Sequence, residues 1–138
     1  MVALLFFVII LFVKVPTIGK HLILEASFKG DTEKLKDKNF LYRLFREVLE
    51  KSGVTIFGFL DKDFSGDGVS GVFLLGESHF SYHTWPDENY VSMDFYVCGN
   101  AFSESAFLKE IWKNFIVFDA LTLERGIKSG RAFKIKRT

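Results

Sequence analysis

The chain has 138 residues, the usual size of one domain with a single core. Hydrophobic residues make up 49% of it, and the 17 phenylalanines favour a sheet-rich protein with apolar area left for a subunit interface. Its 18 basic and 17 acidic residues argue against nucleic-acid binding and against a polybasic membrane patch.

The N-terminus is an apolar run, Met1 to Val13. It is shorter than the ~20 residues that a membrane-spanning helix needs. It also lacks the basic start and the small-residue cleavage site of a secretory signal. It could be an extra edge strand or helix, a weak membrane anchor, or residues translated upstream of the true start. We interpret residues 1–18 as a non-essential hydrophobic extension and 19–138 as the domain.

The first half of the domain predicts a strand, a helix and a second strand. Lys20–Phe28 is apolar and extended, which is typical of a core strand. Asp31–Lys51 is expected to be a helix that Gly53 ends, because apolar residues recur every three or four positions, at Leu41, Leu44, Phe45, Val48 and Leu49. Val54–Leu60 is β-branched and aromatic, so it predicts a strand, and the polar, glycine-rich Asp61–Gly68 predicts a loop.

Three more strands and a second helix follow. The strands are expected over Val69–Leu75, His79–Trp85 and Tyr90–Val97. Ser103 can cap a helix whose buried side would be formed by Phe107, Leu108, Ile111, Trp112 and Phe115.

The end of the chain completes the expected architecture. Ile116–Leu123 predicts a closing strand, and the basic segment Arg131–Thr138 predicts a solvated tail. Strands mostly in hairpin order with two main helices indicate an α+β fold, a two-layer sandwich of an antiparallel sheet and helices.

Two loop patterns resemble known binding motifs but fail their tests. The acidic residues from Asp61 to Asp67 imitate the start of a calcium loop, yet Val72 stands where a bidentate glutamate is needed, and strands flank the loop. The glycines Gly66, Gly68 and Gly71 spell a dinucleotide fingerprint, but a strand follows them where a helix is required.

A metal site is not expected from the histidines and the cysteine. His79 and His83 share a strand face, but Cys98 is the single cysteine and no carboxylate completes a zinc pattern. Taken alone, Cys98 is typical of an inert core thiol, and each histidine of a hydrogen-bonded structural residue. One cysteine excludes an intramolecular disulfide and fits a reducing compartment, so we expect a cytoplasmic protein.

A series of short blocks is more specific than any of these patterns. They are Gly19-Lys20-His21-Leu22, Gly68-Val69-Ser70-Gly71, Glu77-Ser78-His79, His83-Thr84-Trp85-Pro86, Cys98-Gly99 and Glu124-Arg125-Gly126. In order and spacing, the segment from residue 19 to 126 resembles the bacterial S-adenosylmethionine decarboxylase family.

The resemblance implies that the chain cuts itself between Glu77 and Ser78. The products would be a β chain, 1–77, and an α chain, 78–138, headed by a pyruvoyl cofactor made from Ser78. It assigns Ser70 and His83 to this processing, with His83 as the base that removes the Ser78 α-proton. Attack of a serine hydroxyl on its own peptide needs a strained turn and a stabilised oxyanion, and Gly76 would ease such a turn.

The same resemblance implies the catalytic chemistry of the mature protein. The pyruvoyl ketone would form a Schiff base with the substrate amine and accept the electrons released with carbon dioxide. Cys98 would reprotonate the substrate carbon, and an ordinary thiol, with a pKa of ~8.5, still carries its proton near neutrality. A proton added to the cofactor carbon instead would convert the cofactor to alanine.

Substrate recognition carries over less completely. Phe64 matches the aromatic residue that stacks on adenine, although a plain core role is an equal alternative. Trp85 and Asp87 are the other expected substrate contacts, and Asp87 stands where the family usually has glutamate. The acidic Asp61-Lys62-Asp63 also departs from the family. The hypotheses are therefore decarboxylation of S-adenosylmethionine for spermidine synthesis, decarboxylation of ornithine or arginine, or a non-enzymatic binding domain. The resemblance also implies a homodimer with shared active sites.

Overall fold

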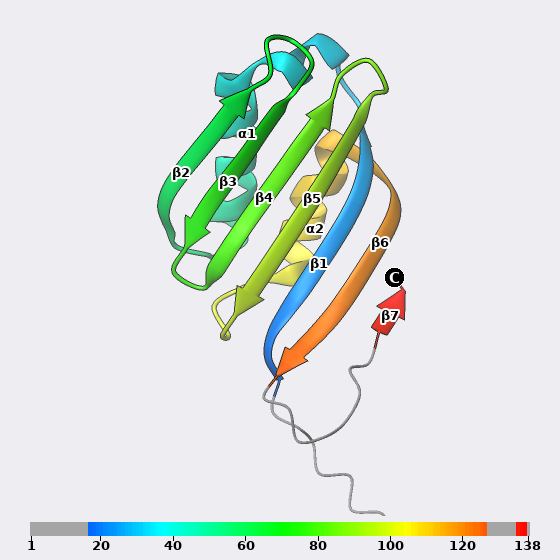
Figure 1. Ribbon diagram of the computed structural model, residues 1–138. Coiled ribbons are helices and arrows are strands. Elements are labelled where there is room, and N and C mark those ends of the chain that lie inside the picture. Colours follow the sequence, from blue (N-terminus) through cyan, green and yellow to red (C-terminus); the bar gives the residue numbers. More distant parts are fainter. Residues whose placement is uncertain (1–16, 127–134, 138) are drawn as a thin grey trace, which may run out of the picture.

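One antiparallel sheet, backed by two helices, forms the molecule. The computed structural model describes residues 17–126 and 135–137 (Figure 1). The strand order is β2-β3-β4-β5-β1-β6-β7, and all the pairings are antiparallel. The elements are β1 (Thr17–Phe28), η1 (Thr32–Lys36), α1 (Lys38–Lys51), β2 (Ile56–Asp63), β3 (Val69–Leu75), β4 (Ser78–Trp85), β5 (Tyr90–Cys98), α2 (Glu104–Asn114), β6 (Phe115–Gly126) and β7 (Ile135–Arg137).

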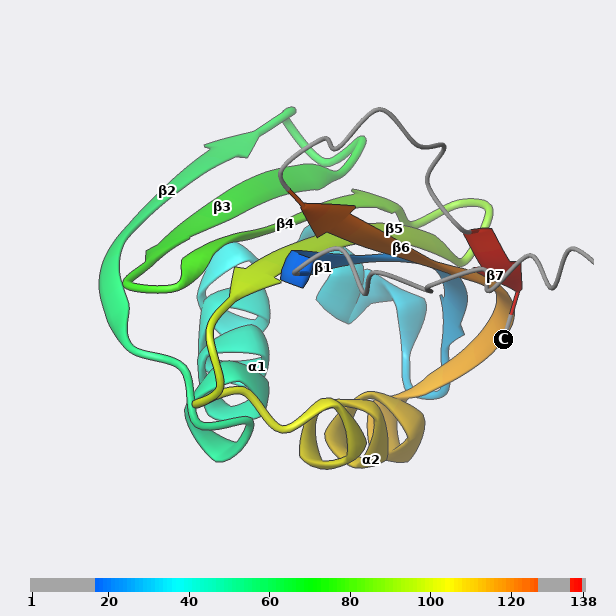
Figure 2. The ribbon, with the colours of Figure 1, turned by 90° about the horizontal axis from the view of Figure 1, so that it is seen from below.

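The two helices lie on the same face of the sheet, and no described element covers the other face (Figure 2). This confirms the expected two-layer α+β sandwich. The core fills the space between the layers; Phe45 of α1, for example, stacks on Tyr82 of β4 with ring centroids 4.4 Å apart. Because side chains alternate along a strand, the residues between the core positions point to the uncovered side, here called the open face. The apolar segment Met1–Val13 lies outside the described residues.

The expected first helix is two helices. Asp31 begins η1 by accepting from the Glu33 N–H, and Asp37 interrupts the run and caps α1 by accepting from the Asn39 and Phe40 N–H groups. A side chain that satisfies free N–H groups at a helix start makes such a break favourable. The apolar stripe of α1 is otherwise as predicted, except that Leu44 is only partly buried.

The second helix begins as expected, but one predicted core residue is exposed. The Ser103 side chain accepts from the Ala106 N–H at 3.3 Å and caps α2. Phe107 and Ile111 are buried, whereas Trp112 is 55% exposed. The next position along a helix lies about 100° around its axis, which turns Trp112 away from the core. Phe115 is buried as predicted, but it begins β6 rather than belonging to the helix.

Several strands extend beyond their predicted limits. β2 continues through Asp61 to Asp63, because backbone pairing with β3 does not depend on apolar side chains, so the loop spans 64–68. The tail was not expected to form a strand, but Ile135–Arg137 pairs with Leu121–Leu123 of β6. An edge strand offers unpaired N–H and C=O groups that such a segment can satisfy.

Within the described ranges, no helix is long and apolar enough to span a bilayer.

Candidate active site

The Glu77–Ser78 peptide lies in the tight turn between β3 and β4. Leu75 and Ser78 are paired across the hairpin, so Gly76 and Glu77 form the turn. Ser78 has a φ of 151°, a value that residues with a side chain rarely adopt. Backbone conformations of this kind cost about 1–3 kcal/mol and persist where the surrounding structure enforces them. The predicted cleavage position is therefore a strained one.

Hydrogen bonds from the end of β5 and from the segment just before β2 hold this turn in place. The Glu77 carbonyl oxygen accepts from the Cys98 N–H at 2.8 Å, at the end of β5. The Glu77 carboxylate accepts from the Thr55 N–H at 2.9 Å and from the Thr55 hydroxyl at 3.3 Å. The Gly76 N–H donates in turn to the Thr55 carbonyl at 2.8 Å. Both ends of Glu77 are thus fixed, and the carbonyl that a Ser78 hydroxyl would attack already has a donor.

Gly76 contributes space rather than unusual backbone freedom. Its φ is not positive, unlike that of Ser78. A side-chain carbon at Gly76 would lie 3.0 Å from the Phe57 ring and 3.4 Å from Thr55 Cβ. Gly76 can therefore ease the turn through its small size, while the unusual φ lies at the serine itself. The small residue lets the hairpin pack against the segment that leads into β2.

Ser70 and His83 form a cross-strand pair on the open face. They are direct neighbours in the β3–β4 ladder, and Ser70 Oγ lies 2.7 Å from His83 Nδ1. Both line a pocket of about 340 Å³ together with Phe64 and Trp85. The structure therefore brings the two residues expected to act in processing together with two of the three expected substrate contacts.

Of the expected substrate contacts, Phe64 lines this pocket but Asp87 does not. Phe64 is 49% exposed at the pocket wall, so it is not a plain core aromatic. The Asp87 side chain is 85% exposed, does not line the pocket, and lies 3.9 Å from Lys36 Nζ. Gly68, which also lines the pocket, has a φ of 146°, and a side-chain carbon there would lie 2.0 Å from the Thr84 carbonyl oxygen.

The predicted site residues fall into two groups within one protomer. Ser78 and Cys98 meet at one end of the sheet, where Cys98 contacts the Glu77 carbonyl. Ser70 and His83 lie toward the other end, five residues further along β4 from Ser78. With a rise of about 3.3 Å per residue, this places the α-carbons of Ser78 and His83 about 16 Å apart. A histidine side chain cannot bridge that distance, so one chain does not unite the whole set.

The residues of the metal-like and calcium-like patterns make other contacts in this structure. Among the described residues, no three His, Cys, Asp or Glu side chains come together in an arrangement that could hold a metal ion. The His79 ring lies 6.0 Å from the Tyr96 ring, and His83 is engaged with Ser70. In the calcium-like segment, Asp61 lies 3.8 Å from Lys38 Nζ.

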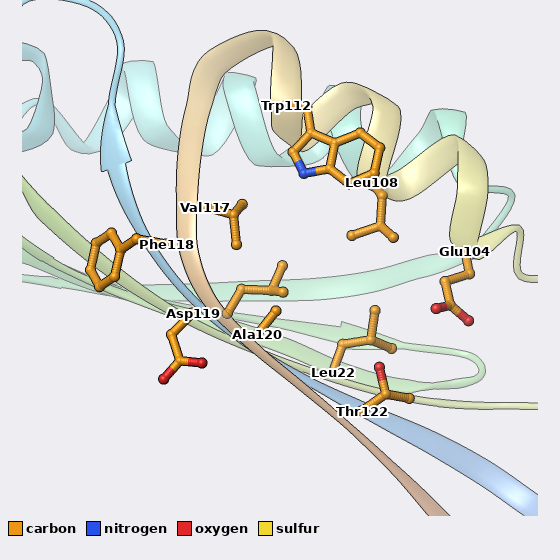
Figure 3. Close-up of a pocket in the computed structure, with 10 residues that line it drawn as sticks. Leu22, Glu104, Leu108, Trp112, Val117, Phe118, Asp119, Ala120 and Thr122 are labelled. Carbon is orange, nitrogen blue, oxygen red and sulfur yellow. The ribbon is translucent and has the colours of Figure 1, made fainter. Parts of the chain in front are cut away.

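A different pocket of about 250 Å³ opens between α2 and β6 (Figure 3). Trp112 and Leu108 of α2 lie over one side of it, and Leu22 and Val117 lie on the sheet side. It contains none of the residues expected to act in cleavage, catalysis or substrate binding, so the candidate site is the open face and the β3–β4 hairpin.

Comparisons with known proteins agree with this arrangement. The sequence model of the S-adenosylmethionine decarboxylase family matches residues 20–125. An S-adenosylmethionine decarboxylase proenzyme of Prochlorococcus marinus is 39% identical over 60% of this chain and 66% of its own length. One from Methanococcus maripaludis is 34% identical over 80% of this chain and 91% of its own length.

A solved structure gives the same result for the fold. The crystal structure of the adenosylmethionine decarboxylase from Aquifex aeolicus superposes with a TM-score of 0.69 at 25% identity, covering 84% of this chain and 97% of that one. The chain spans somewhat less than two thirds of two of these relatives, 66% of the Prochlorococcus protein and 64% of one from Synechococcus. The matched segment nevertheless contains the hairpin, the Ser70–His83 pair and Cys98. The chain belongs to the S-adenosylmethionine decarboxylase family.

Proposed function

We propose that this chain is a proenzyme that cleaves itself between Glu77 and Ser78 and then decarboxylates S-adenosylmethionine, a small-molecule substrate. The mature protein would consist of chains 1–77 and 78–138. One observation carries the proposal: Ser78 has a strained φ of 151° beside a carbonyl that already accepts the Cys98 N–H at 2.8 Å. Family relatives named as proenzymes support it.

The first step is a rearrangement of the peptide bond. The Ser78 hydroxyl adds to the Glu77 carbonyl carbon, and negative charge develops on the carbonyl oxygen. The Cys98 N–H stabilises this charge, as an oxyanion hole does. The C–N bond then breaks, the serine oxygen keeps the acyl group, and the nitrogen becomes an amine. Release of the strained backbone favours this direction.

The second step requires a base. His83 takes the proton from the Ser78 α-carbon, the Oγ–Cβ bond breaks, and residues 1–77 leave with a free Glu77 carboxylate. Addition of water and loss of ammonia leave a pyruvoyl group at residue 78. The Ser70 hydroxyl, 2.7 Å from Nδ1, holds the imidazole ring in orientation. The hairpin residues fit this group, since Ser78 supplies its atoms at a strained position; once formed, it supplies an electron sink for decarboxylation.

Two copies of the chain would complete each site. Ser78 and His83 lie about 16 Å apart along one strand, which is beyond the reach of a proton transfer. On the open face, Leu60 is 72%, Leu74 60% and Trp85 42% exposed, so a second sheet has apolar area to bury. We therefore propose a homodimer in which the open faces meet and the partner's His83 serves Ser78. We also place the protein in the cytoplasm, where Cys98 stays a free thiol.

The mass of the purified protein tests self-cleavage directly. We expect two fragments, 1–77 and 78–138, in place of one 15.8 kDa chain. The Ser78→Ala variant should stay a single chain because it has no hydroxyl to attack the carbonyl. A folded wild-type chain that remains whole after prolonged incubation would refute the proposal.

Mixed dimers test whether the site is shared. A His83→Ala chain and a Ser78→Ala chain are each expected to remain uncleaved alone. When they are co-expressed with different tags, the His83→Ala chain should be cut, because the partner's His83 reaches its Ser78. If neither chain is cut in an isolated mixed dimer, the shared site is wrong even though wild-type cleavage stands.

The substrate is tested by carbon dioxide release from the processed protein. We expect release from S-adenosylmethionine, since Phe64 and Trp85 give the pocket two exposed aromatic walls for an adenine ring. Ornithine and arginine are the comparison substrates. Faster release from either of them would contradict the assignment while leaving self-cleavage intact.

A further inference from the structure

Tyr96 lies on the open face beside the candidate proton donor, near the end of β5. It lies on β5 two residues before Cys98, so both side chains point to the same face. The Arg125 guanidinium sits over the Tyr96 ring, 4.2 Å from its centroid. The His21 and His79 rings flank Tyr96, each with a centroid distance of 6.0 Å.

Gly19 makes this cluster possible. It pairs with Cys98 on one side and with Arg125 on the other, so the three residues form one row across β5, β1 and β6. A side-chain carbon at Gly19 would lie 2.8 Å from Tyr96 Cε2 and 3.1 Å from Cys98 Sγ. The tyrosine ring and the thiol therefore converge in the space that this glycine leaves empty.

In a contact between the Tyr96 phenol and the Cys98 thiol, the phenol would be the donor. The neighbouring Cys98 side chain is the main cause that raises the pKa of Tyr96, followed by desolvation, while the charge of Arg125 acts in the opposite direction. Because the ring and the thiol converge beside Gly19, a protonated Tyr96 would donate its O–H to the sulfur. A sulfur lone pair that accepts this bond leaves the S–H free to point elsewhere, and the same bond stabilises the thiolate once the proton has gone.

We propose that Tyr96 is a positioning residue that orients the Cys98 thiol for proton donation, with Arg125 holding the Tyr96 ring over Gly19. This role rests on the proposed function, in which Cys98 delivers a proton to the substrate carbon. A misdirected proton would reach the cofactor carbon; water would then release the substrate skeleton as an aldehyde, and its nitrogen would remain on the chain as alanine. Tyr96 would therefore control how often the protein inactivates itself.

The first test needs no cofactor. In the uncleaved Ser78→Ala background, Cys98 is the one cysteine, so iodoacetamide labels a single site. Tyr96→Phe keeps the ring and its access but removes the O–H that stabilises the thiolate. We expect alkylation at pH 7.5 to slow about five-fold, the worth of one ordinary hydrogen bond. An unchanged or faster rate would overturn the proposal.

The second test counts inactivation events in processed protein. An N-terminal alanine on chain 78–138 can be read by Edman degradation, whereas a pyruvoyl terminus is blocked. After equal turnover of S-adenosylmethionine, Tyr96→Phe should carry about five-fold more alanine than the wild type, while its self-cleavage is unchanged. Equal alanine would refute the role of Tyr96, whereas a wild type that never cleaves would refute the proposed function instead.

Tyr42 provides a matched control. It is also a tyrosine with an arginine over its ring, Arg46 at 5.9 Å, and its hydroxyl accepts a hydrogen bond from Arg46 at 3.0 Å. It lies on α1, on the covered side of the sheet. Tyr42→Phe should change neither the alkylation rate nor the alanine fraction; a change as large as that of Tyr96→Phe would show a general packing effect and overturn the specific role.

Discussion

The strain at Ser78 can be measured as a difference between two uncleavable variants. Ser78→Ala and Ser78→Gly both lack the hydroxyl that we propose attacks Glu77, so both should stay in the precursor form. Alanine keeps the unfavourable contacts of a φ of 151°, whereas glycine has no side chain and adopts this φ freely. In an ordinary strand position alanine is more stable than glycine. At position 78 we expect the reverse, with the Ser78→Gly precursor more stable than the Ser78→Ala precursor.

The size of the difference follows from two opposing terms. Relief of the strained φ is worth about 1–3 kcal/mol. The extra freedom of glycine in the unfolded chain costs about 0.5–1 kcal/mol. The Ser78→Gly variant should consequently be more stable than the Ser78→Ala variant by about 0.5–2 kcal/mol.

Urea unfolding at one fixed protein concentration measures this difference, because association would otherwise shift the midpoint. Ser81, a regular position of β4, is the control: there glycine should be less stable than alanine by about 0.5–1 kcal/mol. If glycine is also the less stable residue at position 78, the precursor stores no strain at this serine, and strain cannot drive its cleavage.

Three further variants probe the neighbourhood of the hairpin and the pocket. Thr55→Val removes the hydroxyl that reaches the Glu77 carboxylate at 3.3 Å but keeps the backbone bond, so gel densitometry should show cleavage slowed about two- to five-fold; an unchanged rate would exclude that contact. Phe64→Ala should raise the KM for S-adenosylmethionine about ten-fold without slowing self-cleavage, because a stacking wall is lost; an unchanged KM would remove Phe64 from the substrate site. Gly68→Ala should lower the free energy of unfolding by about 2 kcal/mol or more, read by urea titration, because its new carbon would meet the Thr84 carbonyl; a neutral effect would mean that the loop relaxes easily.

Most of the strands and both helices could be predicted because their side-chain periods are local. The alternating pattern of β5 and the cap at Ser103 required no knowledge of the rest of the chain. One error was local, since the Asp37 side chain caps α1 and so divides the expected helix. Other errors came where the tertiary surroundings decide: β7 forms because the edge of β6 is available. Trp112 was misplaced because an apolar side chain can also face the surface.

Some residues of the candidate site could be predicted from the sequence, and others became apparent only in the structure. The family blocks identified the Ser70–His83 pair and the Glu77–Ser78 bond, because their spacing is preserved along the sequence. Thr55 was missed, since its hydrogen bonds to Glu77 join residues 22 positions apart without a motif. Tyr96 was missed as well, because its meeting with Arg125 depends on the pairing of three strands.

The sequence by itself predicted which residues carry the chemistry, and it determined most of the strands and helices that hold them, since both depend on short-range pattern and spacing. Only the tertiary structure decided that the Cys98 N–H meets the Glu77 carbonyl, because antiparallel pairing brings the end of β5 to the β3–β4 hairpin. It alone also separated Ser78 from His83, because an extended strand fixes the distance between its residues and cannot fold back to bring them together.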